Sequence, residues 1–183
     1  MADPEIKLDE FFTRVLSAIG RTTEVEVAEL LKKTRKTVAV AESLTGGQIS
    51  ARLTSQPGSS DFFVGGIVCY HNRIKVMELG VPASLIAKES PVSRDVAIVM
   101  AEGIKKRYRV DIGLAATGIA GPGSVNPPKP IGLTYIGLAS DTGSMAKELM
   151  LSGNRSDIRD KATAAALGML WLHLGGEEVL NKL

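Results

Sequence analysis

The segment 42–47, Glu-Ser-Leu-Thr-Gly-Gly, follows a short apolar run and precedes a stretch with a helical pattern. A helix that begins near Thr45 would present unpaired backbone N–H groups, and Gly46 and Gly47 would let a ligand approach the backbone closely. Ser43 could then act as a nucleophile, with those N–H groups as an oxyanion hole or a phosphate cradle. Serine and threonine are also among the best N-cap residues, so this segment alone supports a structural role at least as well.

A serine nucleophile needs a base, and neither histidine has an obvious carboxylate partner. The alternative base is a lysine with a lowered pKa, as in Ser–Lys hydrolases. Lys75 follows the predicted strand 62–70, and its side chain could reach the same sheet edge as Ser43. Most lysines are exposed surface residues, and sequence spacing leaves both interpretations open.

Two further groups of residues could bind an anion. The segment 117–124 is rich in glycine, and Thr117 with the glycines after it could form a backbone nest, although a plain loop is the simpler interpretation. Arg155 and Arg159 lie one helical turn apart near a predicted helix start, so they could face one phosphate together. Solvated arginines would show the same spacing.

Strands and helices must bring these groups together. Short apolar runs predict strands at 37–41, 62–70 and 110–116, and two later runs joined by a turn at 141–143 predict a hairpin of strands at 133–139 and 145–151. Helical patterns predict two helices within 5–34, divided at Gly20, and further helices at 48–53, 74–79, 82–88, 94–107 and 154–174. This alternation predicts an α/β sandwich with a mixed, mostly parallel sheet. Ligands bind such sheets beyond the carboxyl ends of parallel strands, where both glycine-rich turns fall.

Several other residues are expected to have structural roles. Ser93 can cap the helix 94–107, and Cys69 lies in an apolar run typical of a buried thiol. His173 falls on the apolar side of the last helix, which predicts a structural role, and Trp171 is expected to pack in the core or at an interface. The basic run 32–36 has no interleaved aromatic residues, so a solvated helix end is favoured over a nucleic-acid patch.

Length and composition exclude several classes of protein. The chain has 183 residues, of which 44% are hydrophobic and 23% charged, values that predict one globular domain and exclude disorder. A net charge of +2 does not predict a polyanion partner. One cysteine and two histidines cannot form an internal disulfide or a His/Cys zinc site. Neither a signal peptide nor a membrane span is evident, so we expect a cytoplasmic protein with no nucleic-acid, membrane or metal partner.

An ordered set of motifs resembles the CinA C-terminal domain family over residues 22–175. The set comprises AESLTGG at 41–47, PGSS at 57–60, GG at 65–66, Tyr70 with Asn72 and Lys75, Val81, TGIAGP at 117–122, KPIG at 129–132, and Gly153 with Arg155 and Arg159. The resemblance implies a three-layer α/β/α sandwich. It also implies deamidation of nicotinamide mononucleotide to nicotinate mononucleotide and ammonia, without a cofactor.

The resemblance also implies roles for individual residues. Ser43 would be the nucleophile, Lys75 its base, and Tyr70 a neighbour of both. The substrate-binding residues would be Glu42, Thr45, Gly46, Gly47, Thr117, Gly118, Gly121, Arg155 and Arg159. The phosphate would lie on Arg159, Arg155 or a helix N-terminus, and the chain is expected to form a homodimer.

The sequence departs from the family pattern in two ways. Leu44 stands where the family commonly has cysteine, which removes thiol chemistry there and leaves serine chemistry intact. Many relatives carry a large N-terminal hydrolase domain, for which this chain is too short. We expect instead an N-terminal helical extension at 1–21, which could pack or dimerise, and a CinA C-terminal-like domain at 22–183.

Other functions would give the same motifs. A nucleotide-binding module without turnover, acting through a protein partner, would use them only to hold a phosphate. Hydrolysis of another amide or of a phosphate ester in the same pocket is a third possibility.

Overall fold

A five-stranded mixed sheet forms the centre of the molecule. The computed structural model describes residues 22–123 and 128–176, so the expected helix before Gly20 lies outside the described residues. The strands are β1 (Val38–Glu42), β2 (Phe63–Val68), β3 (Ile112–Gly118), β4 (Leu133–Ser140) and β5 (Gly143–Met150), in the spatial order β2-β1-β3-β4-β5. β1 pairs in parallel with β2 and β3, whereas β4 runs antiparallel to β3 and β5. The predicted mixed sheet and its hairpin are confirmed.

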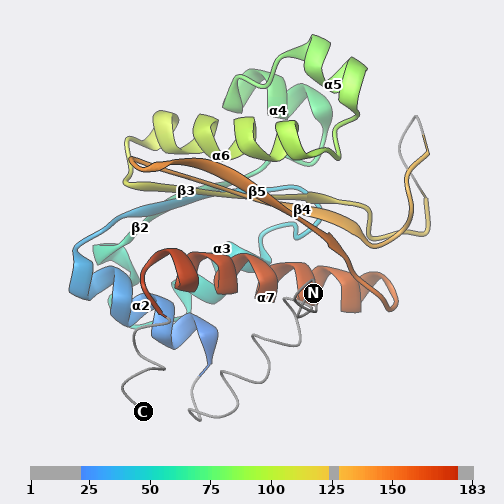
Figure 1. Cartoon of the computed structure of the whole chain (residues 1–183). Coiled ribbons are helices and arrows are strands. Elements are labelled where there is room, and N and C mark those ends of the chain that lie inside the picture. The colour runs from blue at the N-terminus through green and yellow to red at the C-terminus, as the bar shows by residue number, and fades with distance from the viewer. Residues whose placement is uncertain (1–21, 124–127, 177–183) are drawn as a thin grey trace, which may run out of the picture.

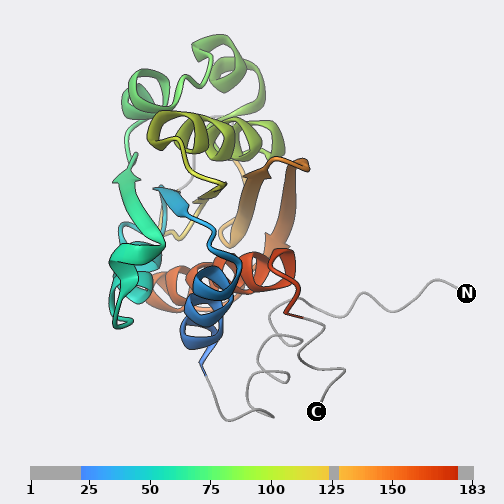
Figure 2. The same ribbon diagram turned by 90° about the vertical axis from the view of Figure 1, so that its left-hand side faces the viewer.

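Helices cover both faces of this sheet, as the three-layer expectation required. One face carries α2 (Thr23–Thr34), α3 (Gln48–Thr54) and α7 (Arg155–His173). The other carries α6 (Arg94–Tyr108), with α4 (Asn72–Leu79) and α5 (Ala83–Glu89) outside it (Figure 1). A short 3-10 helix, η1 (Ser59–Asp61), precedes β2. Figure 2 shows the sheet between the two helical layers. No helix within the described ranges is long and apolar enough to cross a bilayer.

Successive side chains of the central strands are buried on opposite faces of the sheet. Val40 and Leu114 pack in the cluster under α7, whereas Ala39, Ala41 and Ala115 pack in the cluster under α6. Trp171 of α7 is fully buried in the cluster under that helix, which confirms core packing for it. Other apolar residues of α7 are buried in the same cluster: Ala162, Ala165, Ala166, Met169 and Leu170. Small residues on the α6 side let that helix approach the sheet closely.

Local capping fixes where the long helices begin. The Ser93 side chain accepts a hydrogen bond from the backbone N–H of Val96, as predicted for the start of α6. Asn154 and Asp157 form a capping box at the start of α7. A cap of this kind fixes the direction in which Arg155, the first residue of α7, leaves the backbone.

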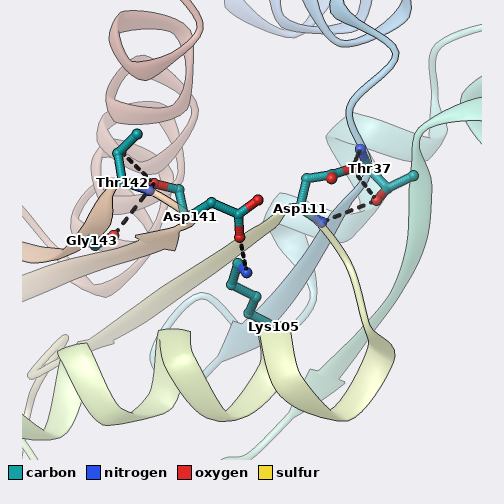
Figure 3. A network of polar contacts seen from close by, with 7 residues as sticks. Thr37, Lys105, Asp111, Asp141, Thr142 and Gly143 are labelled. Carbon is teal, nitrogen blue, oxygen red and sulfur yellow. Dashed lines mark hydrogen bonds and ion pairs between the residues drawn. The ribbon is translucent and has the colours of Figure 1, made fainter.

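The end of the sheet away from the glycine-rich turns is held by polar contacts (Figure 3). The Asp111 carboxylate accepts hydrogen bonds from the backbone N–H and the hydroxyl of Thr37, each at 2.7 Å, which ties the beginnings of β1 and β3 together. Lys105 of α6 forms an ion pair of 2.7 Å with Asp141 in the β4–β5 turn. The carboxyl ends of the parallel strands β1, β2 and β3 lie at the opposite end of the sheet.

Candidate functional site

Ser43 and Lys75 meet at the carboxyl ends of β1 and β2. Ser43 directly follows β1, and Lys75 lies in α4, which begins four residues after β2 ends. The Lys75 Nζ lies 3.0 Å from the Ser43 Oγ and 2.7 Å from the carbonyl oxygen of Cys69, with the Tyr70 carbonyl oxygen at 3.4 Å. Lys75 is only 1% exposed, so the alternative interpretation of it as an exposed surface lysine is wrong.

Parallel pairing of β1 and β2 sets this geometry. The backbone N–H of Cys69 donates to the carbonyl of Glu42, which continues the ladder one step past β2. Cys69 is therefore fixed beside Ser43, and its own carbonyl oxygen is directed to Lys75. Its thiol is buried, as predicted. Burial raises the pKa of the Cys69 thiol, so the sulfur stays protonated as a core group.

The surroundings of Lys75 favour its neutral form. Burial lowers the pKa of the Lys75 ammonium, because the charged form loses its hydration in the protein interior. A neutral amine has two N–H donors and one lone pair. The carbonyls of Cys69 and Tyr70 can accept the two donors, which directs the lone pair to the Ser43 hydroxyl. In this state Lys75 can take the proton of Ser43.

A cavity of about 180 Å³ opens above the pair. It is lined by Ser43, Leu44, Tyr70, Asn72, Lys75, Pro91, Val92, Thr117, Gly118, Ala120 and Arg155. Five of the predicted site residues therefore share one cavity with the expected nucleophile. The set includes two basic side chains and no acidic one.

Glu42 does not contact this cavity, contrary to its expected substrate-binding role. It is fully buried, and its carboxylate accepts hydrogen bonds from the backbone N–H groups of Gly47, Ile49 and Ser50 at 2.9–3.1 Å, and from the Ser50 hydroxyl at 2.7 Å. Glu42 is thus the N-terminal cap of α3, because a carboxylate satisfies the unpaired donors there.

The same contacts correct the expected oxyanion hole. The backbone N–H of Gly47 is bound by Glu42, and that of Gly46 donates to the Ser43 carbonyl at 3.2 Å. Thr45 is fully buried and is not part of the cavity lining. α3 begins at Gln48, not near Thr45, because the residues before it form a turn with positive φ at both glycines.

The two arginines have separate positions and do not face one ligand together. The guanidinium of Arg159 donates from Nε to the Leu44 carbonyl and from Nη2 to the Thr45 carbonyl, each at 2.9 Å. Arg159 thus holds the loop after Ser43. Arg155 lines the cavity and donates to the Gly121 carbonyl at 2.6 Å and to the Tyr70 hydroxyl at 2.9 Å.

Thr117 and Gly118 do not lie in the expected loop. Thr117 and Gly118 are the last residues of β3 and pair with β4, so their backbone does not form an anion-binding nest. Both still line the cavity, and the Thr117 hydroxyl donates to the Pro91 carbonyl at 2.9 Å. Gly121 contributes its carbonyl to Arg155.

Sequence reasoning did not assign some of the lining residues. Asn72 lines the cavity, and its place in the motif between Tyr70 and Lys75 could have identified it as a site residue. Pro91 and Val92 lie in the connection before α6 and gave no local signal, because only the tertiary fold brings them to the cavity. Within residues 22–123 and 128–176, no three His, Cys, Asp or Glu side chains are grouped so as to hold a metal ion.

The structure is thus a mixed α/β/α sandwich with a buried serine–lysine pair at the carboxyl ends of its parallel strands. The CinA C-terminal domain model matches residues 21–174, and the chain belongs to this family. A CinA-like protein from Dictyoglomus thermophilum is 50% identical over 152 residues, which cover 82% of this chain and 37% of that protein. The chain thus spans less than half the length of the curated relatives it matches.

Solved structures show the same fold. The competence damage-inducible protein A (ComA) from Klebsiella pneumoniae has a TM-score of 0.81 and 29% identity, over 84% of this chain and 95% of that chain. The competence/damage inducible protein CihA from Agrobacterium tumefaciens has a TM-score of 0.74 and 31% identity, over 96% of this chain and 99% of that chain.

Proposed function

We propose that the chain is an amidohydrolase that deamidates nicotinamide mononucleotide through Ser43 and Lys75. The observation that carries this proposal is the 3.0 Å contact between the Ser43 Oγ and a buried lysine whose other two partners are carbonyl oxygens. A nucleophile and a base within hydrogen-bond distance are what covalent catalysis requires. Family membership supports the choice of a carboxamide as the group attacked.

The first half of the reaction forms an acyl-enzyme. Lys75 takes the Ser43 proton as the Ser43 Oγ bonds to the carboxamide carbon, and the carbonyl π electrons move to its oxygen. For that oxyanion we propose the backbone N–H of Leu44, because Leu44 follows the nucleophile and lines the cavity. The tetrahedral intermediate collapses, the C–N bond breaks, and the Lys75 ammonium gives its proton to the nitrogen that leaves as ammonia.

The second half restores the enzyme. A water molecule gives a proton to neutral Lys75 and attacks the acyl carbon, and the C–O bond to Ser43 then breaks. Ser43 regains its proton from Lys75, and nicotinate mononucleotide leaves. Tyr70 lies beside the reacting groups, and its hydroxyl is held by Arg155.

Ammonia release from nicotinamide mononucleotide by the purified protein tests the proposal. Ser43→Ala and Lys75→Met are each expected to lower kcat/KM by about 10³-fold or more, since removing a nucleophile or its base removes the covalent route. Lys88→Met is the matched control, because the Lys88 side chain is 80% exposed and does not line the cavity. Circular dichroism would establish that each variant folds.

The alternative is a nucleotide-binding module without turnover. It predicts that folded wild-type protein binds nicotinamide mononucleotide, releases no ammonia, and loses only affinity on Lys75→Met. That result would contradict the amidohydrolase proposal. Ammonia release that survives Ser43→Ala would contradict the mechanism.

A further inference from the structure

The short connection between α5 and α6, residues 90–92, forms part of the cavity wall without belonging to a helix or a strand. Pro91 and Val92 both line the cavity. Ser90 before them is fully buried, and its backbone has φ of 77° and ψ of 153°, a conformation that favours glycine. A residue with a Cβ keeps such a conformation only where its surroundings fix it. This part of the wall therefore depends on contacts from outside the connection.

Lys129 binds both ends of this connection. Its Nζ donates to the Glu89 carbonyl at 3.1 Å and to the Val92 carbonyl at 2.7 Å. Glu89 is the last residue of α5, and the terminal carbonyls of a helix attract a cation because they have no partner within the helix. Since one ammonium bridges both carbonyls, it fixes how far the end of α5 lies from the start of α6.

The contacts from Lys129 are the strong ones among those that hold the connection. Hydrogen bonds from an ammonium are charge-assisted and roughly twice as strong as bonds between neutral groups. The Thr117 hydroxyl donates to the Pro91 carbonyl at 2.9 Å, and the Ser90 hydroxyl accepts from the Val92 N–H at 3.3 Å, so both of these pairs are neutral. Lys129 is not part of the cavity lining, so any effect on a ligand there passes through Pro91 and Val92.

Resting on the amidohydrolase proposal above, we propose that Lys129 is a positioning residue that sets the shape of the cavity wall at Pro91 and Val92. The hydrogen bonds that join Ser43 and Lys75 and hold the Lys75 amine involve none of these three residues. Lys129 therefore acts on how tightly the substrate is held and not on the chemical step, which predicts a change in KM at nearly constant kcat.

Steady-state kinetics of ammonia release test this division. Lys129→Met keeps most of the side chain and removes the charged donor, so KM for nicotinamide mononucleotide should rise about tenfold while kcat stays within about threefold. Lys129→Arg keeps a cation with several donors and should restore most of the loss. Lys32→Met is the matched control, since the Lys32 ammonium also donates to a backbone carbonyl, that of Pro57, outside the cavity lining.

A double-mutant cycle shows whether Lys129 acts through the wall. In a Val92→Ala protein, Lys129→Met should raise KM by only about two- to threefold, because part of its effect passes through the side chain already removed. An equal rise in both backgrounds would overturn the proposal. A fall in kcat at unchanged KM would also overturn it, since that is the result of losing folded enzyme.

Hydrogen exchange followed by mass spectrometry tests the wall itself without any ligand. In Lys129→Met protein, the amides of a peptide covering residues 89–93 should exchange about tenfold faster, while those of α2 keep the wild-type rate. Should Lys129→Met fail to fold, Lys129→Gln takes its place, and the shorter neutral donor should give a smaller change in the same direction. Exchange at the wild-type rate in residues 89–93 would refute the positioning role.

The outcomes separate this inference from the enzymatic proposal on which it rests. Binding of nicotinamide mononucleotide can be measured in Ser43→Ala protein, with and without Lys129→Met. Weaker binding and faster exchange in the Lys129 variant, beside a wild-type protein that releases no ammonia, would support the wall role and refute the amidohydrolase. Ammonia release with a KM independent of Lys129 would refute the wall role alone. No binding to folded Ser43→Ala protein would refute both.

Discussion

The surroundings of Lys75 fit it for the role of base that we propose. Three oxygen atoms lie within 3.4 Å of its nitrogen, and two of them are carbonyls that can only accept. This arrangement assigns the lone pair of a neutral amine to Ser43. The consequence can be measured as a dependence on pH.

We expect kcat/KM for deamidation to rise with pH and to reach a plateau at high pH. The apparent pKa of this rise should lie below 10.5, the ordinary value for lysine. The reason is that only neutral Lys75 can accept the Ser43 proton, and burial lowers the pKa at which it becomes neutral. A pH–rate profile measured with nicotinamide mononucleotide checks this. A rate that falls as pH rises through the same range would contradict the role of Lys75 as base.

The same shift sets the sign of a stability effect. Between the lowered pKa of folded Lys75 and 10.5, the unfolded chain binds more protons than the folded one, so the free energy of unfolding rises with pH. Below the folded pKa both states are protonated and this contribution is constant. Lys75→Met should lack this rise, which urea unfolding at several pH values would show.

Residue identity predicted only in part which side chains meet at the cavity. Ser43, Lys75 and Tyr70 were nominated from the sequence, and the structure brings all three to one cavity. Glu42, Thr45 and Arg159 belong to the same motifs, yet none of them lines the cavity. Glu42 and Arg159 hold the loop after Ser43, and Thr45 is buried within that loop. A motif records which residues a site needs but not which of them face the ligand, because side-chain direction depends on the tertiary fold.

At the scale of elements, the short helix α3 depends on one buried carboxylate. Four donors from Gly47, Ile49 and Ser50 converge on Glu42 at the end of β1. This contact joins β1 to α3 across the loop that carries Ser43, so both ends of that loop are held in place.

Glu42→Gln should destabilise the fold by about 2 kcal/mol or more, because an amide nitrogen replaces one acceptor and leaves buried N–H groups unpaired. Urea unfolding measures this loss, and kcat should fall with it as the loop loosens. Ser50→Ala is the matched control: it removes one hydroxyl donor and keeps the backbone contacts, so a loss of about 1 kcal/mol is expected. Equal losses in the two variants would contradict the capping role.

Elements with local signals were predicted well, and those set by distant pairing were not. The Ser93 cap and the hairpin of β4 and β5 follow from neighbouring residues, and both are confirmed. The predicted strand 110–116 stopped too early, since β3 continues through Gly118 by pairing with β4. That pairing joins residues far apart in sequence, which periodicity does not reveal.

The whole molecule builds its cavity from segments spread over more than a hundred residues. Lining residues come from the end of β1, the region of α4, the connection before α6, the end of β3 and the start of α7. The alternation of strands and helices predicted an α/β sandwich, and the family resemblance implied its two layers of helices. Neither predicted the order of the strands, because that order depends on how these segments pack in space.

A ligand in this cavity should stabilise the entire fold, because it contacts all of these segments at once. In Ser43→Ala protein, nicotinamide mononucleotide at a hundred times its Kd should add about 2.7 kcal/mol, which raises Tm by roughly 5–10 °C. Differential scanning calorimetry measures this shift, with nicotinamide riboside at the same concentration as a reference. An unchanged Tm at saturating nucleotide would contradict binding at this site.

The contacts of Glu42 and Arg159 have a consequence for how such a site can diverge. Both hold the loop after Ser43 from positions outside the cavity, whereas Pro91, Val92 and Ala120 form the cavity wall. Exchanges in the wall can reshape the space offered to a ligand while the reactive pair keeps its spacing. A relative that keeps the Ser43–Lys75 pair can therefore change its substrate through single substitutions in the cavity wall.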